Sequence, residues 1–170
     1  MIILIPLGGL GKRFRIQGYK EPKALIAVND KFIIFHLIDN LIKNSDLSNI
    51  KYIYIPYNNE YSEYNFEKLI QDNYPGLRFK FLLLEDNTRG AAETILIALR
   101  SLMSDQISYP ISYKDMKDIH DCPIICIDAD NFYTTDILNK WNGNNAVITF
   151  NDKSSEPKYS YVIVNDNNYI

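Results

Sequence analysis

Strand-like apolar runs alternate along this chain with segments whose apolar residues recur at helical spacing. We expect strands at residues 1–7, 23–28, 50–57, 77–84, 122–128, 145–150 and 159–164. We expect helices at residues 32–44, 59–76, 91–103 and 134–141. Such alternation is typical of βαβ units, which build a mainly parallel sheet with helices on both faces. The sequence therefore predicts a three-layer, Rossmann-like α/β fold with a mixed, mainly parallel sheet.

The size and composition of the chain predict a single soluble domain over residues 1–170, because 170 residues can bury a substantial core. The net charge of -3 and the pI of about 5.4 argue against a nucleic-acid partner. No segment approaches the roughly 20 apolar residues of a membrane span. No basic leader precedes the first apolar run. We therefore expect a cytoplasmic protein without a membrane partner, and a homo-oligomer stays open.

The two cysteines, Cys122 and Cys126, fall in one expected strand. Four residues of strand separate their Cα atoms by about 13 Å, too far for a disulfide. Two thiols at this spacing cannot close a zinc site without further ligands, and none are evident. We expect one buried thiol with a second thiol nearby.

Functional residues of a parallel sheet are expected just after its strands, because ligands bind beyond the carboxyl ends of the strands. Three segments of this kind carry polar or glycine-rich sequence: residues 8–15, residues 85–90 and residues 128–131. The first of them ends a buried strand in glycines and then adds cations.

The glycine segment, "GGLGKRFR" at residues 8–15, matches neither of two common phosphate-binding patterns. A dinucleotide fingerprint needs a third glycine where Phe14 stands, and a Walker loop needs a hydroxyl where Arg13 stands. What remains is a turn whose bare amides can approach phosphate oxygens, with Lys12, Arg13 and Arg15 beside it. The alternative is a tight turn with solvated cations.

Asp128 and Asp130 are two residues apart at the end of an expected strand, so their side chains point the same way. Two carboxylates this close favour a bound cation. An aspartate pair at a strand end also marks metal-dependent glycosyltransferases, which use a finished sugar nucleotide. A non-catalytic nucleotide-binding domain is a third interpretation.

Taken in order, the motifs resemble those of the sugar-phosphate nucleotidyltransferases, a family that includes the nucleoside-diphosphate-sugar pyrophosphorylases. The resemblance rests on "GGLGKRF" followed by "PK" at residues 22–23, and on Ala129-Asp130-Asn131 after a strand. Glu85 and Gly90 have the spacing of the family's base-reading segment. The last part, "EPKYSYVIVNDNNYI", is similar to a hairpin that follows the sheet. The resemblance covers essentially the whole chain.

The resemblance implies transfer of a nucleoside monophosphate from a nucleoside triphosphate to a phosphorylated small molecule, with release of pyrophosphate. A sugar 1-phosphate is the commonest acceptor, and choline phosphate or a similar molecule stays open. The implied catalytic residues are Arg13 and Lys23, and the implied Mg²⁺ ligands are Asp130 and Asp128. The implied nucleotide-binding residues are Leu7, Gly8, Gly9, Gly11, Lys12, Glu85, Gly90 and Ala91.

This chain departs from the family pattern at several positions. Lys12 replaces the usual threonine, Ala129 the usual glycine before the metal aspartate, and Ser160 the hairpin glycine. The family also continues well beyond the hairpin with a part that binds the acceptor and supplies a second magnesium aspartate. We therefore expect this chain to be truncated before that part and to be incomplete as an isolated enzyme.

Glu85 occupies the position that meets the base in similar enzymes, often as glutamine. An ionised glutamate can only accept hydrogen bonds, so it favours a base edge rich in N–H donors. Cytosine and guanine present such edges, whereas uracil and thymine flank one N–H with two carbonyls. The sequence predicts CTP or GTP in preference to UTP or dTTP. Alternatively, Glu85 faces solvent and the backbone near Gly90 reads the base.

Overall fold

A parallel four-stranded sheet forms the centre of the molecule. The structure, a computed structural model, describes residues 1–104, 122–141 and 143–147. Its strands are β1 (Ile2–Leu4), β4 (Tyr52–Tyr57), β5 (Phe79–Leu83) and β6 (Ile124–Cys126). They lie in the order β5-β4-β1-β6, and every neighbouring pair is parallel. The expected mainly parallel sheet is thereby confirmed.

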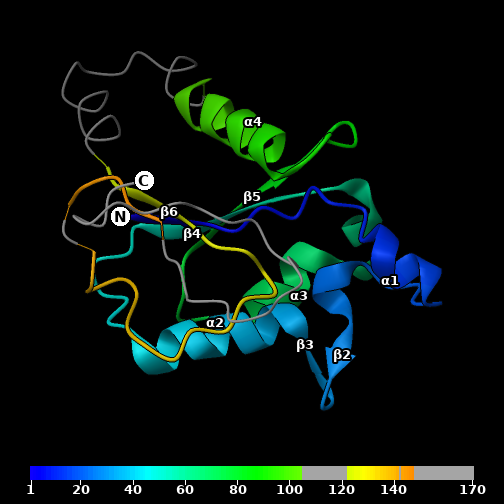
Figure 1. The fold of residues 1–170 in the computed structure, drawn as a ribbon, viewed down its shortest axis with the longest axis horizontal. Coiled ribbons are helices and arrows are strands. Elements are labelled where there is room, and N and C mark those ends of the chain that lie inside the picture. The colour runs from blue at the N-terminus through cyan, green and yellow to red at the C-terminus, as the bar shows by residue number, and fades with distance from the viewer. Residues whose placement is uncertain (105–121, 142, 148–170) are drawn as a thin grey trace, which may run out of the picture.

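Helices cover both faces of this sheet, as Figure 1 shows with α4 on one side and α2 and α3 on the other. These helices are α2 (Ile33–Asn44), α3 (Phe66–Asn73) and α4 (Ala91–Ser104). Alternate residues of β1 point to opposite faces. Ile3 lies in the core cluster that includes α2 and α3, whereas Ile2 and Leu4 join that of α4. A continuous apolar strand is what burial on both faces requires.

The segment that was expected to be a strand at residues 23–28 is only partly extended. Its first part is a 3-10 turn, η1 (Lys23–Leu25), and only β2 (Ala27–Val28) is a strand. β2 pairs in antiparallel fashion with β3 (Lys31–Phe32). The turn between them places Asn29 and Asp30 at φ 51° and 61°, which is the backbone of a tight two-residue hairpin. The apolar run did not reveal this turn, because its turn residues lie just beyond it.

The expected helix at residues 59–76 is interrupted. η2 (Asn59–Tyr64) is a 3-10 helix, and α3 starts only after Asn65, whose φ is 48°. Asparagine tolerates this left-handed backbone better than most residues. A short helix, α1 (Lys12–Ile16), was not expected, and it follows Gly11 with a φ of 60°.

Two expectations near the end of the chain have different outcomes. Residues 134–141 form turns and no helix, so that prediction is wrong. The expected strands at 145–150 and 159–164, and the hairpin with Ser160, lie wholly or mostly outside the described residues. No helix within the described ranges has the length and apolar character to cross a membrane.

Candidate active site

The order of the strands in the sheet reverses between β1 and β6. The chain runs from β1 outward to β4 and β5 and then returns to the other side of β1 with β6. In open α/β sheets, ligands bind outside the carboxyl ends of the strands where the order reverses. The segments that follow β1 and β6 are the glycine loop (residues 8–11) and the aspartate loop (residues 128–131), which were both singled out from sequence.

Asn58, directly after β4, holds the glycine loop in place. Its side-chain Nδ2 donates to the Gly9 carbonyl at 3.2 Å, and its backbone N–H donates to the Leu7 carbonyl at 3.3 Å. Its Oδ1 accepts from the Glu60 N–H at 3.0 Å, and the residue is only 1% exposed. Sequence patterns alone do not single out Asn58, although a polar residue directly after a strand is a usable signal.

Leu7 lies beneath the loop and forms part of the fold. Its side chain is buried in the core, and its N–H donates to the Pro56 carbonyl at 2.8 Å. An isolated parallel bridge joins Leu7 to Tyr57. Leu7 therefore extends the pairing of β1 with β4 and fixes the position at which the glycine loop begins.

Gly8 permits a close approach between the glycine loop and the start of α4. A Cβ atom at Gly8 would lie 2.2 Å from Thr94 Oγ1 and 2.7 Å from Thr88 Oγ1. These two hydroxyls share a hydrogen bond of 2.7 Å, and Thr94 is 1% exposed. Any side chain at this position would separate the loop from α4, so glycine is required here for space.

Lys23 reaches the aspartate loop from η1. Its Nζ lies 2.5 Å from Asp130 Oδ2, and both side chains are partly exposed. The turn that carries Lys23 is fixed by Tyr61, whose hydroxyl accepts from the Ala24 N–H at 3.3 Å. Gly11 lies alongside, since a Cβ there would come within 3.5 Å of the Lys23 Cβ. The structure thus brings together residues from the first and third sequence motifs.

The aspartate loop leaves the sheet in a tight turn. Ile127 N–H donates to the Leu4 carbonyl at 2.9 Å, and Asn131 N–H donates to the Asp128 carbonyl at 3.2 Å. Ala129 is buried in the core, while Asp128 and Asp130 are exposed. Ala129 is not among the described residues with positive φ. The backbone therefore accepts alanine where the resembling family has glycine.

The cations of α1 have two different roles. Arg15 Nη2 pairs with Glu60 Oε2 at 2.9 Å and its Nη1 donates to the Lys20 carbonyl, which anchors α1 to its surroundings. Lys12 and Arg13 are exposed and have no carboxylate partner within the described part of the chain. Their charges are therefore available to an anion.

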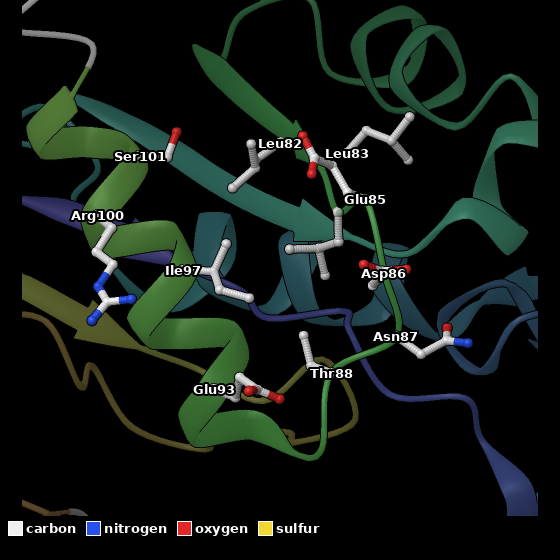
Figure 2. Close-up of a pocket in the computed structure, with 11 residues that line it drawn as sticks. Leu82, Leu83, Glu85, Asp86, Asn87, Thr88, Glu93, Ile97, Arg100 and Ser101 are labelled. Atoms are coloured by element: carbon white, nitrogen blue, oxygen red, sulfur yellow. The ribbon is translucent and has the colours of Figure 1, made fainter.

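The segment after β5 borders a hollow of about 560 Å³ against α4. Figure 2 shows Glu85 and Asp86 on one side of it and Ile97 and Arg100 on the helix opposite. Glu85 is exposed at its rim. The lining residues are Leu82, Leu83, Leu84, Glu85, Asp86, Asn87, Thr88, Glu93, Ile97, Arg100 and Ser101.

The expected base-reading glycine lies at the start of α4. The Gly90 carbonyl accepts from the Thr94 N–H at 3.2 Å, and Ala91 is the first residue of the helix. Both residues are exposed. Glu93 Oε2 accepts from the Arg89 N–H at 2.6 Å, and its Oε1 pairs with the Arg89 guanidinium at 2.8 Å. Glu85 and Gly90 thus lie on either side of Thr88 along the segment that leads from β5 into α4, and the Thr88 hydroxyl lies next to Gly8.

The negative charge of the aspartate loop affects its neighbours. Burial raises the pKa of the Tyr133 hydroxyl; a hydrogen bond from Asn131 acts in the opposite direction, and the charges of Asp128 and Asp130 reinforce the rise. Burial, together with the charge of Asp128, raises the pKa of the Cys126 thiol. Both cysteines are free, as expected, but Cys122 is half-buried and Cys126 is exposed, so the expected fully buried thiol is wrong.

The aspartate loop suits a magnesium ion that is shared with a ligand. Within residues 1–104, 122–141 and 143–147, no group of three or more His, Cys, Asp and Glu side chains comes together as a metal site. Mg²⁺ commonly uses one or two carboxylates and completes its shell with water and substrate phosphates. Asp128 and Asp130 fit this requirement, and their exposure leaves room for the remaining ligands.

The arrangement of strands and helices is similar to the fold of solved nucleotidyltransferases. The chain superimposes on the nucleoside-diphosphate-sugar pyrophosphorylase from Vibrio cholerae RC9 with a TM-score of 0.54 at 19% identity, over 78% of this chain and 48% of that one. It also matches a protein assigned as a glucose-1-phosphate thymidylyltransferase from Bacillus anthracis, solved with sucrose, with a TM-score of 0.55 at 20% identity, over 81% and 47% of the two chains.

These likenesses confirm, at the level of the fold, the resemblance that the motifs predicted. This chain spans about half the length of the two solved chains, at 48% and 47%. Neither a protein-family model nor a curated protein sequence matches the chain.

Proposed function

We propose that this chain binds a nucleoside triphosphate at the carboxyl ends of β1 and β6 and serves nucleotidyl transfer to a phosphorylated small molecule. The main support for this proposal is the ion pair between Lys23 and Asp130 beside the glycine loop. It joins a cation, a carboxylate and bare backbone amides at one point of the sheet edge. Phosphoryl-transfer sites need this combination, because the transition state spreads charge over phosphoryl oxygens.

The proposed reaction is an in-line displacement at the α-phosphorus. A phosphate oxygen of the acceptor forms a bond to that phosphorus, the bond to the β-phosphate bridge oxygen breaks, and pyrophosphate leaves. The protein mainly positions the reactants and neutralises their charge. A sugar 1-phosphate is our proposed acceptor class, supported by the activities for which the two structural neighbours are named.

Each candidate residue has a proposed task in this reaction. The amides of residues 8–11 bind the β- and γ-phosphates, with Lys12 adding positive charge. Arg13 stabilises the departing pyrophosphate, for which a planar guanidinium is well suited. Lys23 binds the α-phosphate as a point charge, and to do so its ammonium group must leave or share Asp130. Glu85, Gly90 and Ala91 border the base.

Asp130, with Asp128, is proposed to hold Mg²⁺. A magnesium ion at this loop supplies charge neutralisation for the phosphates. The carboxylate of Asp130 also keeps the Lys23 ammonium near the glycine loop before any ligand arrives. The remaining metal ligands and the acceptor pocket are proposed to come from a part of the protein that the structural neighbours have and this chain does not span.

Binding of a triphosphate tests this proposal directly. Calorimetric titration of the chain with CTP, GTP, UTP and dTTP, with and without Mg²⁺, is expected to show magnesium-stimulated binding of at least one of them. Arg13→Ala is expected to weaken this binding about 10- to 100-fold, because a charge-assisted hydrogen bond contributes about 1.5–3 kcal/mol. Asp130→Asn is expected to remove the magnesium effect and leave most of the metal-free binding.

Lys51→Ala is the matched control. Lys51 is exposed and directly precedes β4, at the edge of the sheet opposite the glycine loop. It removes the same charge as Arg13→Ala and is expected to change the affinity less than twofold. Binding of a sugar nucleotide in place of any triphosphate would support the glycosyltransferase alternative and contradict the proposal. Pyrophosphate release with sugar 1-phosphates is the assay for turnover of the native protein.

A further inference from the structure

We propose that Asn40, a buried residue of α2, positions the aspartate loop for its cation and thereby acts as a positioning residue of the active site. The inference rests on the proposed function, because it concerns the same two aspartates. Asn40 is 4% exposed and lies on the helix face that otherwise packs apolar residues against the sheet. Buried neighbours on that face are Ile34, Leu37, Ile38 and Leu41.

The side chain of Asn40 makes a two-sided contact with the backbone of Tyr133. Its Nδ2 donates to the Tyr133 carbonyl at 2.8 Å, and its Oδ1 accepts from the Tyr133 N–H at 2.8 Å. Asn44, one helical turn further on, also donates to the Tyr133 carbonyl at 3.1 Å. The carboxamide thus satisfies both the N–H and the carbonyl of Tyr133, as a neighbouring strand would.

Tyr133 follows Asp130 by three residues, so this contact fixes the far end of the aspartate loop. The near end is fixed by the hydrogen bond from Ile127 to β1, and the middle by the buried methyl group of Ala129. With both ends and the middle held, the carboxylates of Asp128 and Asp130 have a defined direction. Only Asn131 and Phe132 separate the clamped backbone from Asp130, and both are exposed.

Asparagine is chemically specific at this position. Aspartate would keep the acceptor for the Tyr133 N–H but would set a carboxylate oxygen against the Tyr133 carbonyl. Leucine would fill the space and leave the Tyr133 N–H without its acceptor, which is costly in a buried place, while the Tyr133 carbonyl would keep only the bond from Asn44. Groups that orient metal ligands from behind commonly change metal affinity 10- to 100-fold when they are altered. Asn40 is proposed to orient Asp130 in this way, through the backbone of the aspartate loop.

Tripolyphosphate is a suitable probe, because it contains the triphosphate charge without a base. Its affinity for the chain is measured by calorimetry in Mg²⁺ and in EDTA, and Mn²⁺ binding in its presence is counted by electron paramagnetic resonance. Asn40→Ala is expected to reduce the magnesium-dependent gain in affinity about tenfold. Its affinity in EDTA is expected to stay within about twofold of the wild type, because the glycine loop is held separately by Asn58.

Three further variants separate positioning from general stability. Asn44→Ala removes one of the three hydrogen bonds described between α2 and the Tyr133 backbone and is expected to give a smaller loss of the same kind. Ile38→Val, on the same helix and 0% exposed, lowers the melting temperature without touching these hydrogen bonds and is expected to leave the magnesium gain intact. Asn40→Asp decides the question if Asn40→Ala does not fold, and it is expected to lose the magnesium gain.

The outcomes distinguish the two proposals. If the wild-type chain binds tripolyphosphate with no magnesium gain, the metal part of the proposed function fails and this inference fails with it. If the wild type shows the magnesium-dependent gain in affinity and every folded Asn40 variant keeps it, only the positioning role of Asn40 is overturned. If Ile38→Val loses as much of the magnesium gain as an Asn40 variant with the same melting temperature, the role of Asn40 is only to stabilise the fold.

Discussion

Lys23 Nζ lies 2.5 Å from Asp130 Oδ2, so the cation proposed for the α-phosphate and the carboxylate proposed for magnesium neutralise each other in the ligand-free chain. Their side chains are 34% and 44% exposed, and exposed ion pairs of this kind contribute only about 0.2–1 kcal/mol. The ion pair therefore holds the two side chains in place, and little free energy is needed to separate them when a ligand binds. A phosphate that attracts Lys23 and a metal that attracts Asp130 each make it easier for the other to bind.

The first prediction concerns this competition. Lys23→Met is expected to tighten binding of Mg²⁺ alone by up to about fivefold, because the metal no longer competes with an ammonium group. The same change is expected to weaken the binding of tripolyphosphate, because the site loses a cation. Both affinities are measured by calorimetry, with Lys20→Met as a control that removes a nearby exposed charge. Unchanged Mg²⁺ affinity in Lys23→Met would show that Asp130 is not the metal ligand.

The second prediction compares two adjacent glycines. Gly8→Ala is expected to lower the free energy of unfolding by about 1–3 kcal/mol, because its Cβ would meet the Thr94 hydroxyl at 2.2 Å in a packed interior. Gly9→Ala is expected to change it by less than about 0.5 kcal/mol, since no atom lies within 4 Å of its Cβ. Urea denaturation of the two variants measures the difference.

The double variant Gly8→Ala/Thr94→Ala gives the control for this contact. Because Thr94→Ala removes the nearest obstructing atom, the two changes are expected to cost less together than the sum of their separate costs. Additive costs would mean that Gly8 is required for a reason other than its approach to α4.

Much of the sheet could be predicted because its strands are apolar on both faces, as in β1. Candidate site residues could be proposed from sequence where a motif consists of a few residues close together, such as Gly8 and Gly9 or Asp128 and Asp130. The contact between Lys23 and Asp130 needed only the strand order that brings the first and third motifs to one edge. Parallel strands end at the same edge, so this juxtaposition follows from topology.

The parts that sequence patterns did not reveal depend on single polar contacts across the fold. Asn58 and Asn40 support the two loops through backbone groups that lie far away in sequence, at Gly9 and Tyr133. Nothing in the local spacing of an asparagine shows which backbone it will meet. The failed helix at 134–141 has a similar cause, because Asp136 accepts from the Leu138 and Asn139 N–H groups and stabilises turns instead.

The third prediction concerns the stability of the fold at alkaline pH, which depends on Tyr61. Burial raises the pKa of Tyr61 to about 12; the hydrogen bond from Ala24 acts in the opposite direction, and the charge of Glu60 adds to the rise. Its ordinary value is 10.0, so both the folded and unfolded states keep this proton below about pH 10. Above that pH the unfolded state loses the proton first, and stability falls until the folded pKa is reached.

Tyr61→Phe isolates this effect. At neutral pH the variant is expected to be less stable by about 0.5–1.5 kcal/mol, because the Ala24 N–H loses its acceptor. Between pH 10 and 11.5 the wild type is expected to lose up to about 1.4 kcal/mol per pH unit more than the variant. Urea denaturation across pH 8 to 11.5 gives both quantities. Parallel pH profiles would mean that Tyr61 ionises equally readily in the folded chain.

The last prediction concerns base selection by Glu85. This carboxylate is exposed at the rim of the hollow beside α4, where it is free to meet a base edge and can only accept hydrogen bonds. CTP or GTP with Mg²⁺ is therefore expected to raise the melting temperature of the chain more than UTP or dTTP. Glu85→Gln, which can also donate, is expected to narrow this difference, whereas Asp86→Asn removes a neighbouring charge from the same hollow as a control. If UTP or dTTP stabilises the wild type most, or if Asp86→Asn changes the order as much as Glu85→Gln, base selection lies instead with the backbone around Gly90.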